Sequence, residues 1–194
     1  MQRSHRYIGN YRRGGGNKNL DPLLTGSVKP AETAYGVTQG LHVPDRRTNI
    51  DTIIAVTVCV NYADLFKLCA EANVRHFNKW LVVSDLDDKD THKICDDYDN
   101  IELIKTDCFY KDGAVFNKGA AINKALAAIS LTASTWVLIL DADIVLPLNF
   151  RENLCARKLN THTLYGASRY ICKEPDAFIV FRESGYKDYS VFKK

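Results

Sequence analysis

From residue 50 onward, short apolar runs alternate with segments in which apolar side chains recur every three or four positions. The runs at 53–60, 80–84, 101–105 and 136–140 are rich in Val, Ile and Leu, which is typical of buried strands. The intervening segments show helical spacing and predict three amphipathic helices. The positions that carry this spacing are Leu65, Leu68, Cys69 and Ala72, then Thr91, Ile94, Cys95 and Tyr98, then Ile122, Ala125, Leu126 and Ile129.

This alternation of strand and helix predicts an α/β fold with three layers, α/β/α, and a mainly parallel sheet. The run at 136–140 is apolar at every position, so we expect it to form a central strand. Asn61 is expected to cap the first helix, with Asp64 in the first turn. Ligands of parallel α/β sheets bind outside the carboxyl ends of the strands, which directs attention to the residues that follow each run.

The first 49 residues have a different composition from the rest of the chain. Residues 1–20 are basic and contain three consecutive glycines, which predicts a mobile arm. Residues 21–48 contain three prolines and no clear period, which predicts an extended lead-in. We therefore divide the chain into an arm with lead-in at 1–49 and a folded domain at 50–194.

Net charge and hydropathy exclude several classes of protein. The chain has 194 residues and a net charge of +3. Residues 1–48 carry 8 Lys or Arg and 3 Asp or Glu, a net +5, so the remainder is slightly acidic at −2. A uniformly basic nucleic-acid-binding face is therefore not expected. The sequence has no apolar run of transmembrane length and no apolar stretch near Met1, so we expect neither a membrane span nor an uncleaved secretory signal.

The 6 cysteines are widely spaced and include no CxxC pair, which argues against a zinc ribbon or a thioredoxin-type site. Most of them fall inside apolar stretches. We therefore favour buried free thiols over a set of disulfides, and a reducing, cytoplasmic compartment.

Asp141 and Asp143 carry the sharpest chemical signal, because they follow the fourth apolar run directly. Two carboxylates placed there without a partner would be costly, and their like charges would raise one pKa. A hard divalent cation such as Mg²⁺ or Mn²⁺ resolves both problems. The alternative interpretation is an exposed acidic turn at the end of a strand.

Three further residues are candidates for binding. Lys118 opens the third helix, where a cation is unfavourable unless an anion such as phosphate binds beside it; a solvated loop lysine is the alternative. Asp85 ends the second strand and is either a binding group or a capping residue in an acidic cluster. Tyr62 follows the first strand and is either a ring for stacking on a base or a core aromatic.

Taken together, these segments resemble the GT-A glycosyltransferases, close to family 2 and its virus-encoded relatives. The resemblance rests on the order and spacing of five segments over about two-thirds of the chain, the last of which resembles the strand before an acceptor-side helix. These segments are 57–62, 82–85, 117–126, 138–143 and 176–182.

The resemblance implies the GT-A (nucleotide-diphospho-sugar transferase) fold and an inverting glycosyltransferase of EC 2.4 type. Such an enzyme moves a sugar from a nucleotide-diphosphate donor, here a UDP-sugar, to a glycan or glycoconjugate acceptor. It implies Mn²⁺ or Mg²⁺ as the cofactor, bound by a DxD motif, and no nucleic-acid partner. It also implies a cytoplasmic location, which for a virus-encoded enzyme is the cytoplasm of the host.

Residue by residue, the resemblance implies that Asp143 ligates the metal and that Asp141 contacts the ribose or a metal-bound water and contributes second. His162, the sole His after the DxD motif, is the candidate for a further ligand. Tyr62 would stack on the base, Asp85 would accept from the base or ribose, and Lys118 would face the diphosphate or base. The expected nucleotide-binding set is Val60, Asn61, Tyr62, Asp85, Lys118, Asp141 and Ala142.

The general base is the weakest part of the resemblance. Inverting members use a carboxylate, in an acidic pair beyond the segment that resembles 176–182, and no Glu-Asp pair follows it here. Glu183 is the expected base beside Asp141 and Asp143 in the catalytic set, with Glu174, Asp176 and Asp188 as further candidates. We therefore expect the chain to bind a nucleotide-sugar donor better than it transfers the sugar.

Three alternatives remain open. A nucleotide-sugar-binding module or degenerate transferase would bind without transfer. A HAD-type phosphatase would use Asp141 as a nucleophile, but its motif belongs on the first strand with a long domain after it. A sugar-nucleotide pyrophosphorylase needs a Gly-rich loop after the first strand, and residues 61–64 contain no glycine.

Overall fold

The computed structural model describes residues 47–172 and 175–186, together with residues 188, 190 and 192. All four predicted strands and all three predicted helices between residues 52 and 139 are confirmed. The predicted mobile arm lies outside the described residues. The elements are β1 (Arg47–Thr48), β2 (Thr52–Val58), α1 (Ala63–Asn73), the 3₁₀ turn η1 (Val74–His76), β3 (Lys79–Asp85), α2 (Lys89–Asp96), β4 (Ile101–Thr106), the 3₁₀ turn η2 (Lys111–Gly113), α3 (Lys118–Ala127), β5 (Thr135–Ile139), α4 (Phe150–Cys155), β6 (Leu159–Asn160) and α5 (Pro175–Glu183).

The main sheet has four strands in the order β4-β3-β2-β5, and every neighbouring pair is parallel. The chain moves outward from β2 through β3 to β4, and then returns to the other side of β2 to form β5. The order of the strands therefore reverses direction between β2 and β5. In open α/β sheets a ligand-binding crevice lies at such a reversal, outside the carboxyl ends of the strands.

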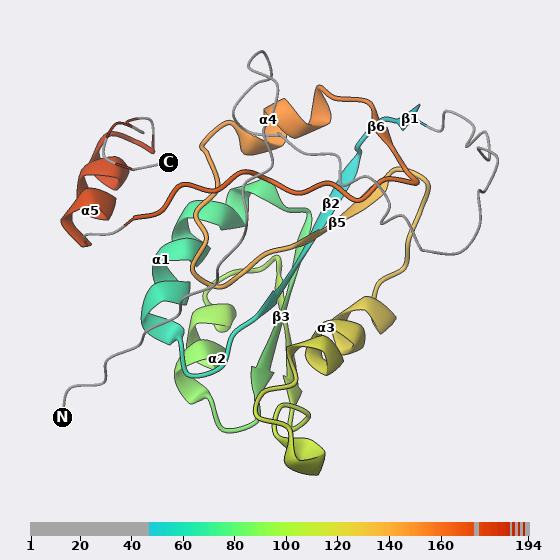
Figure 1. Ribbon diagram of the computed structural model, residues 1–194, viewed down its shortest axis with the longest axis vertical. Helices are drawn as coiled ribbons and strands as arrows, with labels where there is room; N and C mark the ends of the chain where they lie inside the picture. Colours follow the sequence, from blue (N-terminus) through green and yellow to red (C-terminus); the bar gives the residue numbers. More distant parts are fainter. Residues whose placement is uncertain (1–46, 173–174, 187, 189, 191, 193–194) are drawn as a thin grey trace, which may run out of the picture.

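Helices cover both faces of this sheet, which confirms the predicted α/β layering. In Figure 1, α1 and α2 lie on one side of the strands and α3 lies on the other. Phe66 of α1 and Cys95 of α2 pack with Trp80 in one core cluster, whereas Ala121 of α3 packs with Phe109 in the other. Helix α3, on the second face, connects β4 across the sheet to β5, as expected when a crossover changes direction.

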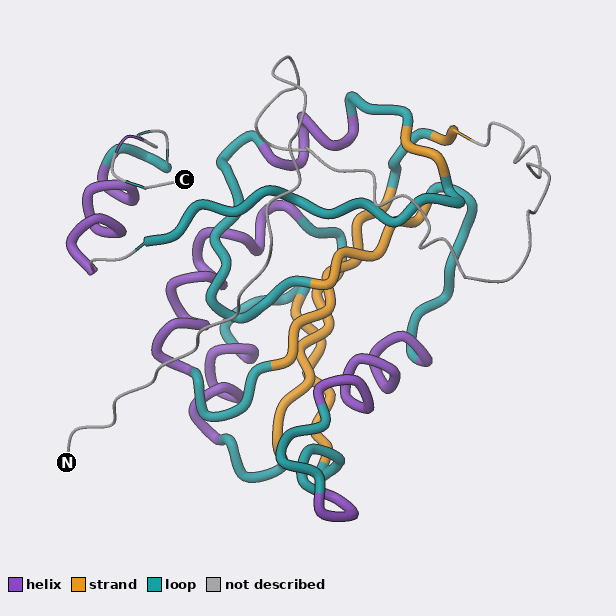
Figure 2. Tube along the Cα trace, viewed as in Figure 1, coloured by secondary structure: helices purple, strands orange, loops and turns teal. Residues whose placement is uncertain are grey.

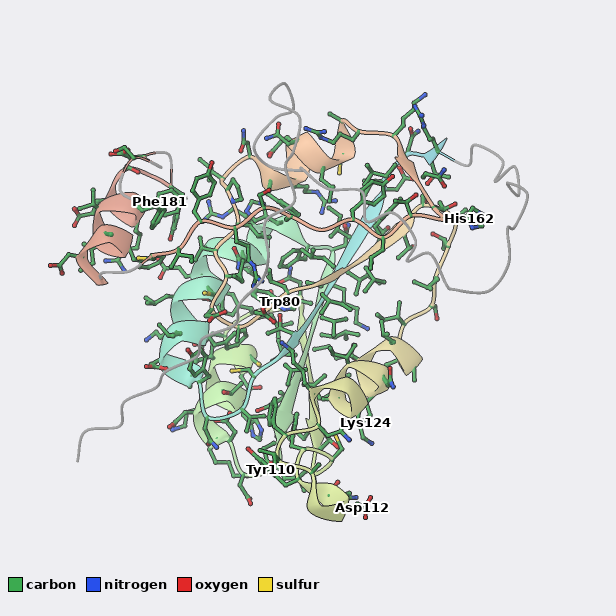
Figure 3. All side chains as sticks on the ribbon, in the orientation of Figure 1. Trp80, Tyr110, Asp112, Lys124, His162 and Phe181 are labelled. Atoms are coloured by element: carbon green, nitrogen blue, oxygen red, sulfur yellow. The ribbon has the colours of Figure 1, made fainter. Side chains whose placement is uncertain are left out.

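Trp80 holds the two inner strands together on the side of α1. Its side chain is fully buried and meets the rings of Phe66 and Phe77 edge to face, with centroids 5.6 and 5.0 Å away. Its indole Nε1–H donates to Thr57 Oγ1 of β2 at 2.9 Å, so the buried polar atom is satisfied. Figure 3 shows this side chain at the centre of the molecule.

The prediction that the run at 136–140 forms a central strand is wrong. In the described sheet β5 is an edge strand that pairs with β2 alone, and the side chain of Ile139 is 53% exposed. The run is apolar at every position for a different reason, since a loop covers part of it. The ring of Tyr165, in the segment that follows β6, packs against Trp136 of β5 with centroids 5.9 Å apart.

The prediction of a strand at 176–182 is also wrong, because these residues lie in helix α5. An apolar run of this length fits a strand or a helix by pattern alone. The helix buries Phe181, whose ring meets those of Tyr186 and Phe192 edge to face at 5.5 and 4.8 Å. A long loop connects β6 to this helix (Figure 2).

A second, two-stranded sheet was not predicted. Strand β1 pairs with β6 in antiparallel fashion, with Arg47 opposite Asn160 and Thr48 opposite Leu159. Each strand has two residues, which is too short for any periodicity to be visible in the sequence. This pairing ties the end of the lead-in segment to the chain that follows α4.

Four of the cysteines, Cys59, Cys69, Cys95 and Cys108, are buried free thiols as expected, whereas Cys155 is half-buried and Cys172 is exposed. Burial raises the pKa of Cys59 to about 11 and that of Cys69 to about 12. Thiols with such pKa values stay protonated near neutral pH and are poor nucleophiles. In the described residues, no helix has both the length and the apolarity that a membrane crossing requires.

Candidate functional site

The carboxyl ends of β2, β3 and β5 bring together the residues that the sequence analysis singled out. Strand β2 lies between the other two, so Asn61 and Tyr62, which follow it, stand between Asp85 at the end of β3 and the aspartates after β5. These three parts of the chain are separated by more than 20 residues each. The parallel topology therefore gathers them at one edge of the sheet.

Asp141 and Asp143 lie in a turn rather than on the strand. Strand β5 ends at Ile139, and Leu140 N–H still donates to Val56 O of β2 at 2.9 Å. Ile144 N–H then donates to Asp141 O at 3.3 Å, which closes a turn over residues 141–144. Within it Ala142 is buried and Asp143 is exposed. The alternation of a strand does not continue here, so the two carboxylates are not equivalent.

Asn73, at the end of α1, holds the chain that follows this turn. Its side-chain Nδ2 donates to Ile144 O at 2.7 Å, and its Oδ1 accepts from Leu146 N–H at 2.8 Å. The side chain is fully buried. This residue could not be singled out from the sequence, because the spacing of α1 marks apolar positions and says nothing about a buried amide.

Lys118 contacts Asp141, although the two residues are far apart in the sequence. Its Nζ lies 2.5 Å from Asp141 Oδ1. Lys118 is the first residue of α3, which is capped by the Asn117 side chain accepting from Ala120 N–H at 2.9 Å. From the sequence, Lys118 is either beside a bound anion such as phosphate or a solvated loop lysine. In this structure the carboxylate of Asp141 lies beside it, close enough to offset the unfavourable position of a cation at a helix N-terminus.

Asp141 has a second cationic neighbour, Arg169, which the sequence analysis did not identify. Arg169 Nη1 lies 3.5 Å from Asp141 Oδ2. Arg169 belongs to the loop between β6 and α5, so a segment distant in the sequence reaches the aspartate turn. Nothing in the local sequence distinguishes this arginine, and only the path of the loop reveals the contact.

Asp143 and Tyr62, which follow the paired strands β5 and β2, are electrostatic neighbours. Partial burial raises the pKa of the Tyr62 hydroxyl, and the negative charge of Asp143 raises it further. Tyr62 remains 40% exposed, so it is not a core aromatic. Among the described residues, the Asp143 carboxylate forms no ion pair, in contrast to Asp141.

The loop after β2 is fixed by a buried carboxylate, Asp88. Asn61 adopts a left-handed backbone conformation with φ +54°, which Asn tolerates better than most residues. Its N–H donates to Asp88 Oδ2 at 2.8 Å, and this oxygen also accepts from Thr91 Oγ1 at 2.7 Å and Ser84 Oγ at 3.2 Å. Burial alone would raise the pKa of Asp88, but these hydrogen bonds outweigh it and lower the pKa.

The prediction that Asn61 caps α1 is wrong. Tyr62 occupies the N-cap position and makes no side-chain capping bond, while Asp64 lies in the first turn as predicted. Helix α2 is capped by Asp88, which accepts from Thr91 N–H at 3.2 Å. Asp85, the last residue of β3, is half-buried, and its Oδ1 accepts from Asp87 N–H at 3.1 Å.

His162 is not brought to the aspartates. It is exposed after β6, and its N–H donates to Asn160 Oδ1 at 2.9 Å. Figure 3 shows it near β6, away from the start of α1. A cavity of about 520 Å³ lies at this same end of the molecule, beside the beginning of β5. It is lined by Arg47, Thr48, Leu131, Thr132, Ala133, Thr135 and Thr161.

The remaining candidates that the structure describes are dispersed, and Glu174 lies outside the described residues. Val60 is partly buried against the core on the side of α3, and Glu183 is exposed at the end of α5. Asp176 lies in the first turn of that helix, and Asp188 accepts from Ser190. In the described parts of the chain, no three His, Cys, Asp or Glu side chains are close enough to hold a metal ion together. Comparison with models of protein families and with curated protein sequences finds no match.

Proposed function

We propose that the carboxyl edge of the sheet binds a nucleotide-diphosphate sugar, with uridine as the base, together with Mn²⁺ or Mg²⁺, and that the chain is a glycosyltransferase. The observation that carries this proposal is the position of the aspartate turn at the reversal of strand order between β2 and β5, where parallel α/β sheets bind ligands. The resemblance to GT-A glycosyltransferases supplies the base, the sugar donor and the type of reaction.

The chemistry of the donor set is compatible with a divalent cation that is shared with a ligand. Asp143 offers an exposed carboxylate without an ion pair among the described residues, whereas Asp141 is already engaged by Lys118. Mg²⁺ in such sites is held by one or two carboxylates plus substrate phosphates and water. Bound there, the cation would neutralise charge on the leaving diphosphate. The protein alone would hold it weakly, because no third protein ligand is present in the described chain.

The residues around the turn have separable tasks in this proposal. Tyr62 presents an exposed ring, and stacking of an aromatic ring on a base contributes about 1–3 kcal/mol. The Asp85 carboxylate accepts a hydrogen bond from the base or ribose. Lys118 supplies positive charge for the diphosphate at the N-terminus of α3, where free backbone N–H groups add to it.

A second candidate function, nucleotide-sugar binding without transfer, is favoured by one observation. Transfer with inversion requires a carboxylate near the donor to deprotonate the acceptor hydroxyl. Glu183 remains the predicted base, but no third carboxylate joins Asp141 and Asp143 in a compact group among the described residues. Hydrolysis or transfer assays with a UDP-sugar distinguish the two functions, and Glu183→Gln tests the predicted base.

Calorimetry of UDP binding tests the proposal most simply. Titrations in EDTA, Mg²⁺ and Mn²⁺ should show that the cation tightens UDP binding, and the linkage requires UDP to tighten cation binding by the same factor. Asp143→Asn retains the shape of the side chain but removes its charge, so it should abolish this coupling. Asp87→Asn, at an exposed acid of the β3–α2 loop, is the matched control. Equal UDP affinity under all three conditions would refute a shared cation.

A further inference from the structure

The two oxygens of the Asp141 carboxylate face two different cations. Lys118 Nζ lies 2.5 Å from Oδ1, and Arg169 Nη1 lies 3.5 Å from Oδ2. The cations come from the start of α3 and from the loop between β6 and α5. Two positive side chains from different parts of the fold therefore contact one carboxylate of the aspartate turn.

The contact with Arg169 is the weaker of the two. The side chain of Arg169 is 66% exposed, and exposed ion pairs of this kind contribute little to stability. In the described chain one of the five guanidinium N–H donors is engaged by Asp141. Arginine binds phosphate oxygens through two parallel hydrogen bonds, which are stronger than this single long contact. Arg169 therefore loses little by exchanging the carboxylate for a phosphate.

We propose that Lys118 and Arg169 are a pair of diphosphate-binding residues, and that the Asp141 carboxylate occupies them when no phosphate is bound. The nature of the ligand rests on the proposed function. New here are a further binding residue, Arg169, and the competition between the Asp141 carboxylate and phosphate for the two cations. Binding of a diphosphate transfers both cations from Asp141 to the phosphate oxygens and releases the carboxylate.

The balance of charge supports this exchange. Lys118 and Arg169 carry two positive charges, and Asp141 and Asp143 carry two negative charges, so the four side chains sum to zero. A divalent cation and the two negative charges of a nucleotide-sugar diphosphate also cancel. The complex therefore adds no net charge to the edge of the sheet, which limits the electrostatic cost of filling it.

The test uses the full chain in EDTA, with inorganic pyrophosphate, UDP and uridine as separate probes in calorimetry. Arg169→Met should weaken pyrophosphate and UDP binding about tenfold, the loss typical of one charge-assisted hydrogen bond. Uridine binding should be unchanged, because the nucleoside has no phosphate. Arg169→Lys should restore part of the affinity. Lys124→Met, an exposed lysine of the same helix as Lys118 (Figure 3), should have no effect.

Asp141→Asn gives a prediction of opposite sign. If the carboxylate competes with phosphate for the two cations, its neutralisation should tighten pyrophosphate binding several-fold in EDTA. If Asp141 instead assists phosphate binding, the same change weakens it, and the competition is refuted. Unchanged pyrophosphate binding by Arg169→Met, or no pyrophosphate binding by the parent chain, overturns the inference as a whole.

The outcomes separate this inference from the proposed function. Pyrophosphate binding that depends on Arg169, without any binding of UDP, supports the cation pair and refutes the nucleotide donor. Cation-dependent UDP binding that is unaffected by Arg169→Met supports the nucleotide donor and refutes the cation pair. Thermal unfolding of the Arg169 and Lys124 variants should match that of the parent, since both residues are exposed.

Discussion

At the scale of single residues, the aspartates of the chain have environments that composition does not distinguish. Asp85, Asp87 and Asp88 occur within four positions, yet Asp88 alone is buried, 6% exposed, and accepts hydrogen bonds from the loop after β2 and from strand β3. Asp85 could be predicted as a candidate because it ends an apolar strand. The role of Asp88 could not be predicted, because its partner Asn61 follows a different strand, β2, and only the fold brings the two residues together.

Removal of the Asp88 carboxylate should therefore destabilise the protein strongly. Asp88→Ala leaves the buried donors of Thr91 and Ser84 and the N–H of Asn61 without this acceptor and removes the cap of α2, so the free energy of unfolding should fall by about 2–4 kcal/mol. Asp87→Ala, one position earlier and exposed, should change it by less than about 0.5 kcal/mol. Urea denaturation measures both. Equal effects of the two variants would contradict the role assigned to Asp88.

His76 predicts a specific dependence of stability on pH. Burial lowers its pKa to about 4, assisted by the positive charges of Arg75 and Arg151 and opposed by Glu152. The unfolded chain binds this proton near the ordinary His pKa of about 6.5, whereas the folded protein does not until about pH 4. Between these values the unfolded state holds more protons, so stability must fall as pH falls.

We expect the free energy of unfolding of the parent chain to decrease by about 1–2 kcal/mol between pH 7 and pH 5 from this group. His76→Leu keeps an apolar side chain beside Phe77 and Phe150 and removes the titration, so its stability should vary less over the same range. Denaturation curves at several pH values provide the comparison. Parallel pH profiles for parent and variant would show that His76 is not responsible.

At the scale of elements, the strands and helices that pack on both sides of β2 and β3 could be predicted because burial imposes their periodicity. The pattern failed where burial comes from a different source. Strand β5 is apolar although it lies at an edge, since the loop carrying Tyr165 covers Trp136, and α5 has an apolar run that fits either period. Strands β1 and β6 are too short to show any period.

The start of α3 offers a test at this scale, because it positions Lys118 beside Asp141. Asn117→Ala removes the side chain that accepts from Ala120 N–H and should lower the free energy of unfolding by about 1 kcal/mol. Asn123→Ala, an exposed position inside the same helix, should be neutral or slightly stabilising because Ala is the better helix former. Thermal and urea denaturation should rank the variants in this order. A greater loss from Asn123→Ala would contradict the assigned cap.

At the scale of the whole molecule, the parallel order β4-β3-β2-β5 places the ends of four separate sequence segments along one edge of the sheet. The presence of Tyr62, Asp85, Lys118 and Asp141 at that edge follows from parallel topology and could be anticipated from the positions of the strand ends. The contact between Lys118 and Asp141 and the arrival of Arg169 could not, since both depend on how the crossover helix and a long loop pass over the sheet.

The molecule presents two candidate binding regions at opposite ends of β5. The edge with Asp143 and Tyr62 follows its carboxyl end, whereas the 520 Å³ cavity with Thr135 and Thr161 adjoins its amino end, close to His162. We assign the nucleotide and the cation to the first region. Locating the bound cation at one of these two ends of β5 is therefore the most direct test, and it requires no knowledge of the acceptor.

Paramagnetic broadening of backbone amide signals by Mn²⁺ in the presence of UDP locates the cation in solution. We predict that the signals of Asn61, Tyr62 and Asp143 broaden first, whereas those of Thr135 and His162 stay sharp. Asp143→Asn should remove the broadening. Broadening centred on Thr135 and His162, or broadening at Asp143 that persists in the Asp143→Asn variant, would contradict the assignment of the site.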